Sequence, residues 1–217
     1  EQILHAVLRG EPHERVAAMI TNWKLEPTRV RLQRVAEQAQ GLARRMGKAP
    51  LQVHIADNAL RLEPGRWSSF WSAFVHVMRN AVDHGLESAG ARSAAGKTGN
   101  GTLALTTRLD GQEFVVELAD DGRGIDWRAI ADKARATGLP CETQAQLVEA
   151  LFADGLTTKQ DVSDVSGRGV GMGAARAACR AREGVMSVHS TIGAGTRVEF
   201  RFPREEMHAP VQLRKAS

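Results

Sequence analysis

Cysteine is scarce in this sequence, which has only Cys141 and Cys179 among its 217 residues. The two positions match neither the spacing of a cysteine metal site nor a disulfide framework. The scarcity therefore excludes a small disulfide-stapled secreted domain. It indicates a reducing compartment, which we expect to be the cytoplasm.

The sequence also lacks membrane spans, repeats and stripes of one charge. No apolar stretch approaches the roughly 20 residues that cross a membrane, and neither a secretory signal peptide nor an internal repeat is visible. The 29 Lys and Arg residues are nearly balanced by 25 Asp and Glu residues, spread along the chain. We therefore expect no membrane span and no nucleic-acid partner. Length and apolar content fit one globular domain with a small helical appendage.

The spacing of the apolar residues predicts a mixed order of helices and strands. Helices are expected within residues 3–23 and at 28–46, 126–137, 144–152 and 173–182. Strands are expected at 51–55, 103–109 and 113–119, with 59–62 as the hairpin partner of the first and two last strands around 193–195. Residues 86–101 are rich in Gly, Ala and Ser, so we expect them to form a loop.

One helical stretch, HVMRNAVDHG at residues 76–85, has an unusual polar face. His76, Asn80, Asp83 and His84 fall within about 100° of arc if each residue turns the helix by about 100°. A solvated surface is the ordinary explanation, but Asn, Asp and His favour a helix less than Lys or Glu do. An asparagine oxygen suits Mg²⁺, which proteins commonly share with substrate phosphates. This face therefore points to a nucleotide.

A second pattern, D-x-G-x-G, is formed by Asp120, Gly122 and Gly124 directly after a predicted strand. A carboxylate at a strand end can accept a hydrogen bond from an exocyclic amine, and the glycines let the backbone approach a flat ring. An ordinary Asp-Gly turn contains the same residues. The pattern alone is therefore compatible with a base-binding loop and with a simple turn.

A third pattern places Gly167, Gly169, Gly171 and Gly173 before and at the start of a predicted helix. The free amides and the dipole of a helix N-terminus bind phosphate. A dinucleotide-binding turn would need a strand just before the glycines, and the polar residues 157–166 do not predict one. Gly96-Lys97-Thr98 lacks the first glycine and the strand of a P-loop, so we interpret Lys97 as a loop lysine.

Taken in order, these patterns resemble the ATP-binding domain of sensor histidine kinases, and within that group the chemotaxis kinase (CheA) class. The matching segments are H-x-x-R-N-x-x-D-H-G at 76–85, the adenine box at 120–124, LFADGLTT at 151–158, SGRGVGM at 166–172 and the strand turn at 193–196. The resemblance spans residues 28–203. It implies an α/β fold, the Bergerat (GHKL) two-layer sandwich of a mixed sheet and helices that gyrase B and Hsp90 share. Residues 1–27 would be a helical N-terminal segment and 204–217 a C-terminal tail.

The resemblance implies a site for ATP and Mg²⁺. Asn80 would hold the metal with His76 beside it, and Asp120 would select adenine through its amino group. Residues 126–166 would form a lid over the triphosphate. The other nucleotide-binding positions would be Asp83, His84, Gly122, Gly124, Ile125, Thr157, Thr158, Gly167, Arg168, Gly169, Val170, Gly171, Met172 and Thr196.

The implied activity is transfer of the ATP γ-phosphoryl group to a histidine on another domain. His76 stands where related hydrolytic ATPases carry a glutamate base, which favours transfer over hydrolysis. His76 and His84 could instead contact the waters of the metal or the phosphates. Two alternatives stay open: a GHKL-type ATPase, and a catalytically idle module that binds nucleotide and regulates a partner.

The resemblance also implies that this chain is part of a larger protein. His13-Glu14 is similar to the acceptor motif of ordinary sensor kinases, but the downstream proline of that motif is missing, so we expect the acceptor histidine outside this chain. The expected partners are a phosphoacceptor histidine domain, a response-regulator receiver domain and receptor or adaptor proteins. The full-length protein is expected to be a dimer.

Overall fold

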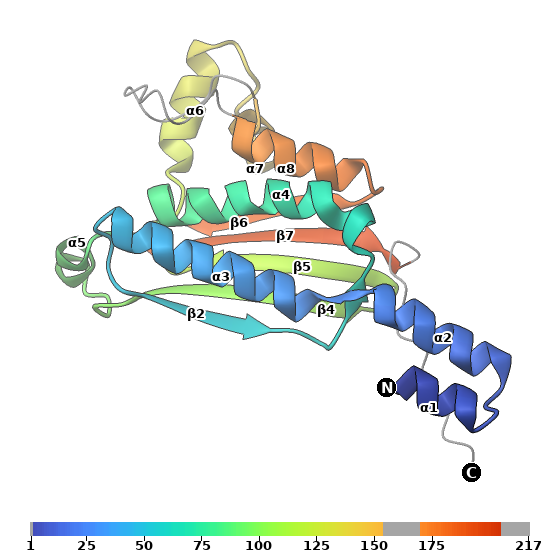
Figure 1. Cartoon of the computed structure of the whole chain (residues 1–217). Helices are drawn as coiled ribbons and strands as arrows, with labels where there is room; N and C mark the ends of the chain where they lie inside the picture. The colour runs from blue at the N-terminus through green and yellow to red at the C-terminus, as the bar shows by residue number, and fades with distance from the viewer. Residues whose placement is uncertain (1, 154–169, 205–217) are drawn as a thin grey trace.

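The computed structural model describes residues 2–153 and 170–204, and Figure 1 follows its elements along the chain. The helices are α1 (Gln2–Leu8), α2 (His13–Lys24), α3 (Thr28–Arg45), α4 (Pro64–Asn80), the π-helical η1 (Ala81–Gly85), α5 (Ala89–Ala94), α6 (Trp127–Ala136), α7 (Gln144–Leu151) and α8 (Val170–Arg180). The strands are β1 (Glu26–Pro27), β2 (Leu51–Ala56), β3 (Arg61–Leu62), β4 (Gly101–Asp110), β5 (Glu113–Asp120), β6 (Val185–Thr191) and β7 (Gly195–Pro203).

Five of the strands form one mixed sheet in the order β2-β4-β5-β7-β6. β2 runs parallel to β4, whereas β4, β5, β7 and β6 pair as antiparallel neighbours. The register sets Asp120, the last residue of β5, opposite Leu103 of β4 and Thr196 of β7. The carboxylate predicted to bind the base therefore lies at the end of the central strand.

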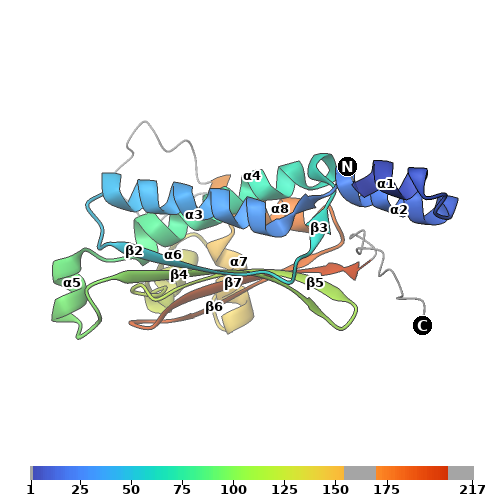
Figure 2. The ribbon, with the colours of Figure 1, turned by 60° about the horizontal axis from the view of Figure 1, so that its bottom comes forward.

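Helices α3, α4 and α8 lie together on one face of this sheet, as Figures 1 and 2 show from two directions. The layers meet in an aromatic core. There Trp67 of α4 packs edge-on against Phe114 of β5 and Phe202 of β7, with ring centroids 5.3 and 4.8 Å apart. Burial of these large apolar side chains holds the layers together. The predicted two-layer α/β sandwich is confirmed.

The hairpin expected between residues 51–55 and 59–62 is not present. β3 pairs antiparallel with β1, and β2 pairs with β4. Ala59 has a positive φ of 53° and turns the chain away from β2, and the backbone N–H of Thr28 then donates to the carbonyl of Leu60 at 2.8 Å. Burial of Leu60 and Leu62 in the core favours this course over a local hairpin.

One helix is present where a loop was predicted, and another helix begins earlier than predicted. Residues 86–101 contain the short helix α5, whose N-cap Ser88 accepts a hydrogen bond from Ala91 N at 3.3 Å. Arg92 of this helix is buried and bonds to Asp121, 29 residues later in the chain. Such contacts hold in place a helix that is too short to be stable by itself. Helix α8 begins at Val170, three residues before the predicted start at Gly173.

At the N-terminus, α1 and α2 pack against each other and extend beyond one end of the sandwich (Figure 1). Ala6 is buried there, whereas Leu4, Leu8 and Trp23 are exposed. No helix in the two described ranges combines the length and the hydrophobicity that crossing a membrane requires. The division of the chain at residues 27 and 203 stays a prediction.

Candidate functional site

The polar stretch at 76–85 was predicted to be one continuous helix, but the structure divides it into two parts. α4 ends at Asn80, and η1 follows as a π-helical turn, with a hydrogen bond from Leu86 N to Ala81 O at 2.8 Å. A π-turn is wider than an α-turn, so the angular positions predicted for Asp83 and His84 are wrong. Single π-turns inside helices occur frequently at functional sites.

Lys48, which follows α3, holds this π-turn in place. Its ammonium group donates to the carbonyl oxygens of Asp83 at 2.6 Å and Leu86 at 2.8 Å. These bonds satisfy acceptors that the end of a helix leaves open. Sequence reasoning missed Lys48, because it precedes Asp83 by 35 residues and belongs to no local pattern.

The four polar side chains of the stretch differ in exposure. His76 and His84 are exposed, whereas Asn80 and Asp83 are half-buried. His84 Nε2 lies 3.8 Å from Asp83 Oδ2. The predicted metal ligands His76 and Asn80 are four residues apart on α4, which places them on the same side of the helix. The amide of Asn80 is the less exposed of these two groups.

Asp120 has an unusual environment for a carboxylate. Its side chain is buried, with 8% relative exposure, and Oδ1 accepts a hydrogen bond from Gly122 N at 2.9 Å. No ion pair to Asp120 is found within the described part of the chain. Burial raises the pKa of Asp120 to about 6, the N–H groups of Gly122 and Thr196 oppose this rise, and the charges of Asp121 and Glu87 add to it. A buried carboxylate with so perturbed a pKa marks a functional-site candidate.

The neighbouring Asp121 is a structural residue by comparison. Its Oδ2 accepts from Arg92 Nη2 at 2.7 Å, and its Oδ1 accepts from Thr102 N at 2.8 Å. Burial by itself would raise the pKa of Asp121, but these two bonds and the Arg92 charge hold it below its ordinary value. Of the two adjacent carboxylates, Asp120 therefore keeps the greater capacity to accept further hydrogen bonds.

Glycine is required where the polar stretch meets the D-x-G-x-G loop. A Cβ on Gly122 would lie 2.2 Å from the carbonyl oxygen of Gly85, and a Cβ on Gly195 would lie 1.9 Å from the carbonyl oxygen of Asp120. The loop also donates from Arg123 N to Gly85 O at 2.8 Å. These close approaches bring the end of η1, the end of β5 and the start of β7 together. The sequence-predicted residues Asp120, Gly122 and Thr196 thus meet in one place.

Ser190 of β6 anchors the end of the same loop. Its hydroxyl accepts from Ile125 N at 2.8 Å, donates to Gly195 O at 2.9 Å and lies 2.9 Å from Thr196 Oγ1. The predicted residues Ile125 and Thr196 are therefore joined through a side chain that sequence reasoning missed. Gly124 fits the loop through its positive φ of 73°.

The phosphate-binding part of the prediction falls mostly outside the described residues. Thr157, Thr158, Gly167, Arg168 and Gly169 lie there, and so does the second half of the lid predicted at 126–166. Val170, Gly171 and Met172 form the first turn of α8. The predicted helix is present after the glycine pattern, but it begins three residues earlier than expected.

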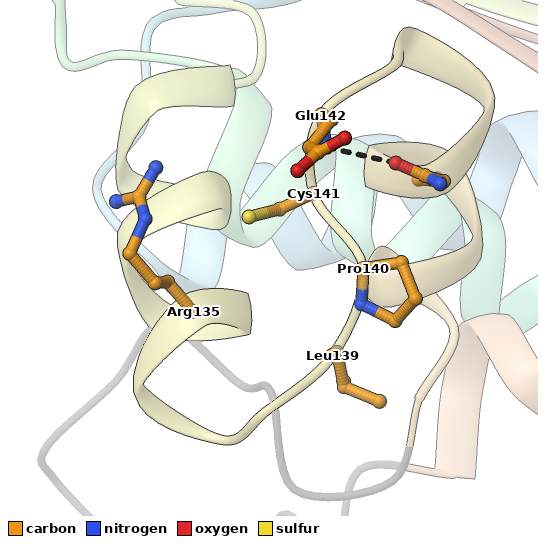
Figure 3. A pocket seen from close by; sticks show the side chains of 6 residues that line it. Arg135, Leu139, Pro140, Cys141 and Glu142 are labelled. Carbon is orange, nitrogen blue, oxygen red and sulfur yellow. Dashed lines mark hydrogen bonds between the residues drawn. The ribbon is translucent and has the colours of Figure 1, made fainter.

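The first half of the predicted lid is a folded helical pair. Ile130 and Ala134 of α6 pack with Ala150 of α7 in a small separate core. The turn between these helices is hollowed by a pocket of about 460 Å³, shown in Figure 3. Its lining residues are Arg135, Leu139, Pro140, Cys141, Glu142 and Gln146, and the Glu142 N–H donates to Gln146 Oε1 at 2.8 Å. None of the predicted nucleotide-binding residues lines this pocket.

Comparison with known sequences relates the chain to a family of ATPases. The model of the histidine kinase-, DNA gyrase B- and HSP90-like ATPases matches residues 71–206. The chain is 39% identical over 133 residues to the chemotaxis protein CheA of Treponema pallidum, a match that covers 59% of this chain and 16% of that protein. It is 38% identical over 138 residues to a gliding motility regulatory protein of Myxococcus xanthus, covering 61% and 18%. The chain thus spans less than a third of these relatives' lengths.

Solved structures show the same fold. The catalytic domain of the histidine kinase ThkA aligns with a TM-score of 0.55 at 16% identity, covering 83% of this chain and 94% of that one. Full-length ShkA in complex with AMPPNP aligns with a TM-score of 0.50 at 20% identity, covering 86% and 31%. The family match covers more than half of the sequence and includes the polar stretch, Asp120 and Thr196. The chain therefore belongs to the family of histidine kinase-, DNA gyrase B- and HSP90-like ATPases.

Proposed function

We propose that this chain is the ATP-binding catalytic domain of a chemotaxis-type histidine kinase, which transfers the γ-phosphoryl group of ATP to a histidine on another domain. The observation that carries the proposal is Asp120, a buried carboxylate that ends the central strand without a cationic partner among the described residues. The similarity to CheA proteins over 59% of the chain supports the choice of kinase class.

Base recognition follows from the chemistry of Asp120. The amino group of adenine donates a hydrogen bond, which an ionised carboxylate accepts. Guanine carries a carbonyl oxygen at the matching position, so two acceptors would face each other. The loop glycines Gly122 and Gly124 let the backbone beside Asp120 pack closely against Gly85 and Thr191, which holds the carboxylate at the strand end. The site should therefore prefer ATP to GTP.

The side chains near the end of α4 fit a magnesium ion. Asn80 offers a half-buried, neutral amide oxygen, and Asp83 offers a half-buried carboxylate three residues later. Oxygen donors of these two kinds suit Mg²⁺, which usually keeps several waters and shares its remaining positions with substrate phosphates. In this proposal Asn80 holds the ion against the phosphates, where its charge neutralises the phosphate oxygens.

Substitution of Asn80 by Ala tests the metal assignment. We expect the affinity for Mg-ATP to fall about tenfold, the loss of one charge-assisted contact, and the affinity for ATP in EDTA to change little. The folded state should not suffer, because alanine favours a helix more than asparagine does. Calorimetric titration with and without Mg²⁺ measures both affinities, with Asn58→Ala, at an exposed position between β2 and β3, as the matched control. An equal loss in both conditions would make Asn80 a structural residue.

Phosphoryl transfer needs an acceptor nitrogen in line with the oxygen that leaves. The P–O bond to ADP breaks as a P–N bond to the acceptor imidazole forms, and the imidazole loses its proton. An imidazole that is neutral near pH 7 needs no strong base, unlike water. His76 is exposed on α4 in the position where hydrolytic relatives carry a glutamate, and this supports transfer over hydrolysis.

The activity is tested with an acceptor supplied in trans. We expect γ-labelled Mg-ATP to label the phosphoacceptor domain of a chemotaxis kinase when this chain is added, and to leave the chain's own seven histidines unlabelled. The label should be lost in acid, kept in base and absent from an acceptor whose histidine is replaced by glutamine. Steady phosphate release without labelling would support an ATPase. Tight ATP binding with neither outcome would support a regulatory module.

The partners expected for the whole protein belong to the same proposal. A phosphoacceptor domain supplies the histidine, and a response-regulator receiver domain takes the phosphoryl group onward. Receptor or adaptor proteins would control the kinase, and a second subunit would complete it. The similarity to CheA proteins supports these partners. The matched region is a small part of each relative, so most of each relative consists of other segments.

A further inference from the structure

A buried ion network underlies the D-x-G-x-G loop and consists of side chains other than those proposed to bind nucleotide. Arg92 of α5 has only 1% relative exposure. Its Nη1 lies 3.1 Å from Glu87 Oε2 and 3.1 Å from Asp121 Oδ1, and its Nη2 lies 2.7 Å from Asp121 Oδ2. The guanidinium thus joins the segment after η1 to the end of β5 through bonds with fixed directions.

Lys97, three residues after the end of α5, completes this network. Its ammonium donates to Glu87 Oε1 at 2.8 Å, to Asp121 O at 2.8 Å and to Gly122 O at 2.6 Å. Burial by itself would raise the pKa of Glu87, but the bond from Lys97 and the charges of Lys97 and Arg92 hold it below its ordinary value. The four side chains therefore form two cations and two carboxylates with matched charge.

The backbone that Lys97 holds is the backbone that shapes the base site. Lys97 binds the carbonyl oxygens of Asp121 and Gly122, one on each side of the Gly122 Cα. The N–H of Gly122 donates to Asp120 Oδ1 at 2.9 Å. One residue further, Arg123 N donates to Gly85 O at 2.8 Å. A shift of the loop at residues 121–122 would therefore move the acceptor oxygens of Asp120.

We propose that Lys97 and Arg92 are positioning residues for base selection, which fix the loop at 120–122 so that the Asp120 carboxylate meets the amino group of adenine. The inference rests on the proposed role of Asp120. Sequence patterns had indicated that Lys97 is an ordinary loop lysine. The inference gives it a role in base selectivity instead. Lys97 does not contact phosphate in this arrangement, because its ammonium is bound to protein oxygens.

Lys97 is the better residue to change. Removing Arg92 would leave the buried Glu87 without its guanidinium partner, and a buried charge without a partner is strongly destabilising. Lys97 is less buried, with 16% side-chain exposure, and Glu87 keeps its bond to Arg92 when Lys97 is lost. Lys97→Met retains the length of the apolar stem and removes the three donated bonds.

The expected result is a loss of base selectivity. For Lys97→Met we expect the affinity for ATP to fall about 10- to 100-fold, as for the loss of charged hydrogen bonds, and the affinity for GTP to stay nearly constant. The ratio of the affinities with and without Mg²⁺ should not change, since Asn80 is untouched. Lys24→Met, at an exposed position on α2, controls for the loss of a lysine. Phe202→Leu, at the opposite end of β7 from Thr196, controls for a loss of stability.

A chemical rescue separates positioning from general destabilisation. In a Cys141→Ser background, Lys97→Cys treated with bromoethylamine regains an ammonium group at nearly the original distance, and ATP selectivity should return. Cys179 should not react, because it is buried and burial raises the pKa of its thiol to about 12. If Lys97→Met does not fold, Lys97→Gln keeps a donor for one carbonyl and should show a smaller loss of the same kind.

A double substitution distinguishes this inference from the proposed function. If Lys97 acts through Asp120, Lys97→Met should cause almost no further loss of ATP affinity in an Asp120→Asn background. An unchanged ratio of ATP to GTP affinity in folded Lys97→Met, or a failed rescue, would overturn the inference and leave Asp120 as the base selector. Unchanged nucleotide affinities in Asp120→Asn alone would instead overturn the proposed role of Asp120.

Discussion

Asp120→Asn should lower the affinity for ATP about 10- to 100-fold and remove most of the preference for ATP over GTP. The size follows from the about 1.5 to 3 kcal/mol that a hydrogen bond to a charged group contributes. The asparagine oxygen can still accept the bond from Gly122 N, so the loop should keep its shape. Calorimetric titration of both proteins with ATP and GTP measures the change.

The control for this substitution is Asp126→Asn. Asp126 is exposed and caps α6 by accepting hydrogen bonds from Arg128 N and Ala129 N. Asparagine is an equally good N-cap, so this variant should bind both nucleotides as the unmodified chain does. If the unmodified chain bound ATP and GTP equally well, the assignment of Asp120 to the amino group of adenine would be wrong.

Without nucleotide, the same substitution should stabilise the fold above pH 6. The pKa of Asp120 is about 6 in the folded protein, against 3.8 for an ordinary aspartate. Between these values the folded state holds more protons than the unfolded state, so the stability contributed by Asp120 falls as the pH rises. Above pH 6 the raised pKa of Asp120 lowers the free energy of unfolding by about 3 kcal/mol. The amide of an asparagine at this position does not titrate, so it avoids this loss. Asp120→Asn therefore gains relative stability with rising pH.

Urea unfolding of both proteins across the pH range tests this linkage. The difference in unfolding free energy should grow by about 2 kcal/mol in favour of Asp120→Asn between pH 4.5 and 7.5. The carboxylates with lowered pKa values, such as Glu87 and Asp121, are present in both proteins, so they largely cancel in the difference. A difference that is constant across this range would mean that Asp120 titrates normally.

Together, these two results would describe one trade-off. The site keeps a carboxylate where folding alone would prefer a neutral group, and binding of a base with an amino group restores part of the lost stability. ATP should therefore stabilise the unmodified chain more than it stabilises Asp120→Asn.

The parts of the fold that sequence patterns predicted are those with local causes. The apolar residues of α3 recur at helical spacing, and Leu32, Val35 and Ala39 are buried as expected. The long strands β4 and β5 alternate and join at the predicted Asp110-Gly111 turn. The D-x-G-x-G pattern led to Asp120, Gly122 and Gly124 as a predicted base-binding loop, because a carboxylate and flexible glycines in a short segment suit that chemistry.

Local pattern failed where a distant part of the chain determines the structure. The hairpin of 51–55 with 59–62 is absent because Leu60 and Leu62 are buried beside the start of α3. The polar stretch becomes a π-turn after Asn80, where Lys48 and Gly122 contact it from segments outside the stretch. Residues 86–101 contain α5, whose buried Arg92 bonds to Asp121, 29 residues away.

Residue types and short spacings predicted which side chains would carry the chemistry: Asn80 on a polar helix face, Asp120 at a strand end and the glycines that follow it. Their types and short spacings were sufficient, because hydrogen-bonding capacity and backbone freedom are properties of single residues. Which of the two adjacent carboxylates stays available depends on contacts between distant segments, since Arg92 pairs with Asp121 and leaves Asp120 buried without an ion pair in the part of the chain that the structure describes. The tertiary structure also gave Lys48, Lys97 and Ser190 their roles. Lys48 bonds to Leu86, 38 residues away, Lys97 to Gly122, 25 residues away, and Ser190 to Ile125, 65 residues away. Such contacts depend on packing rather than on sequence spacing.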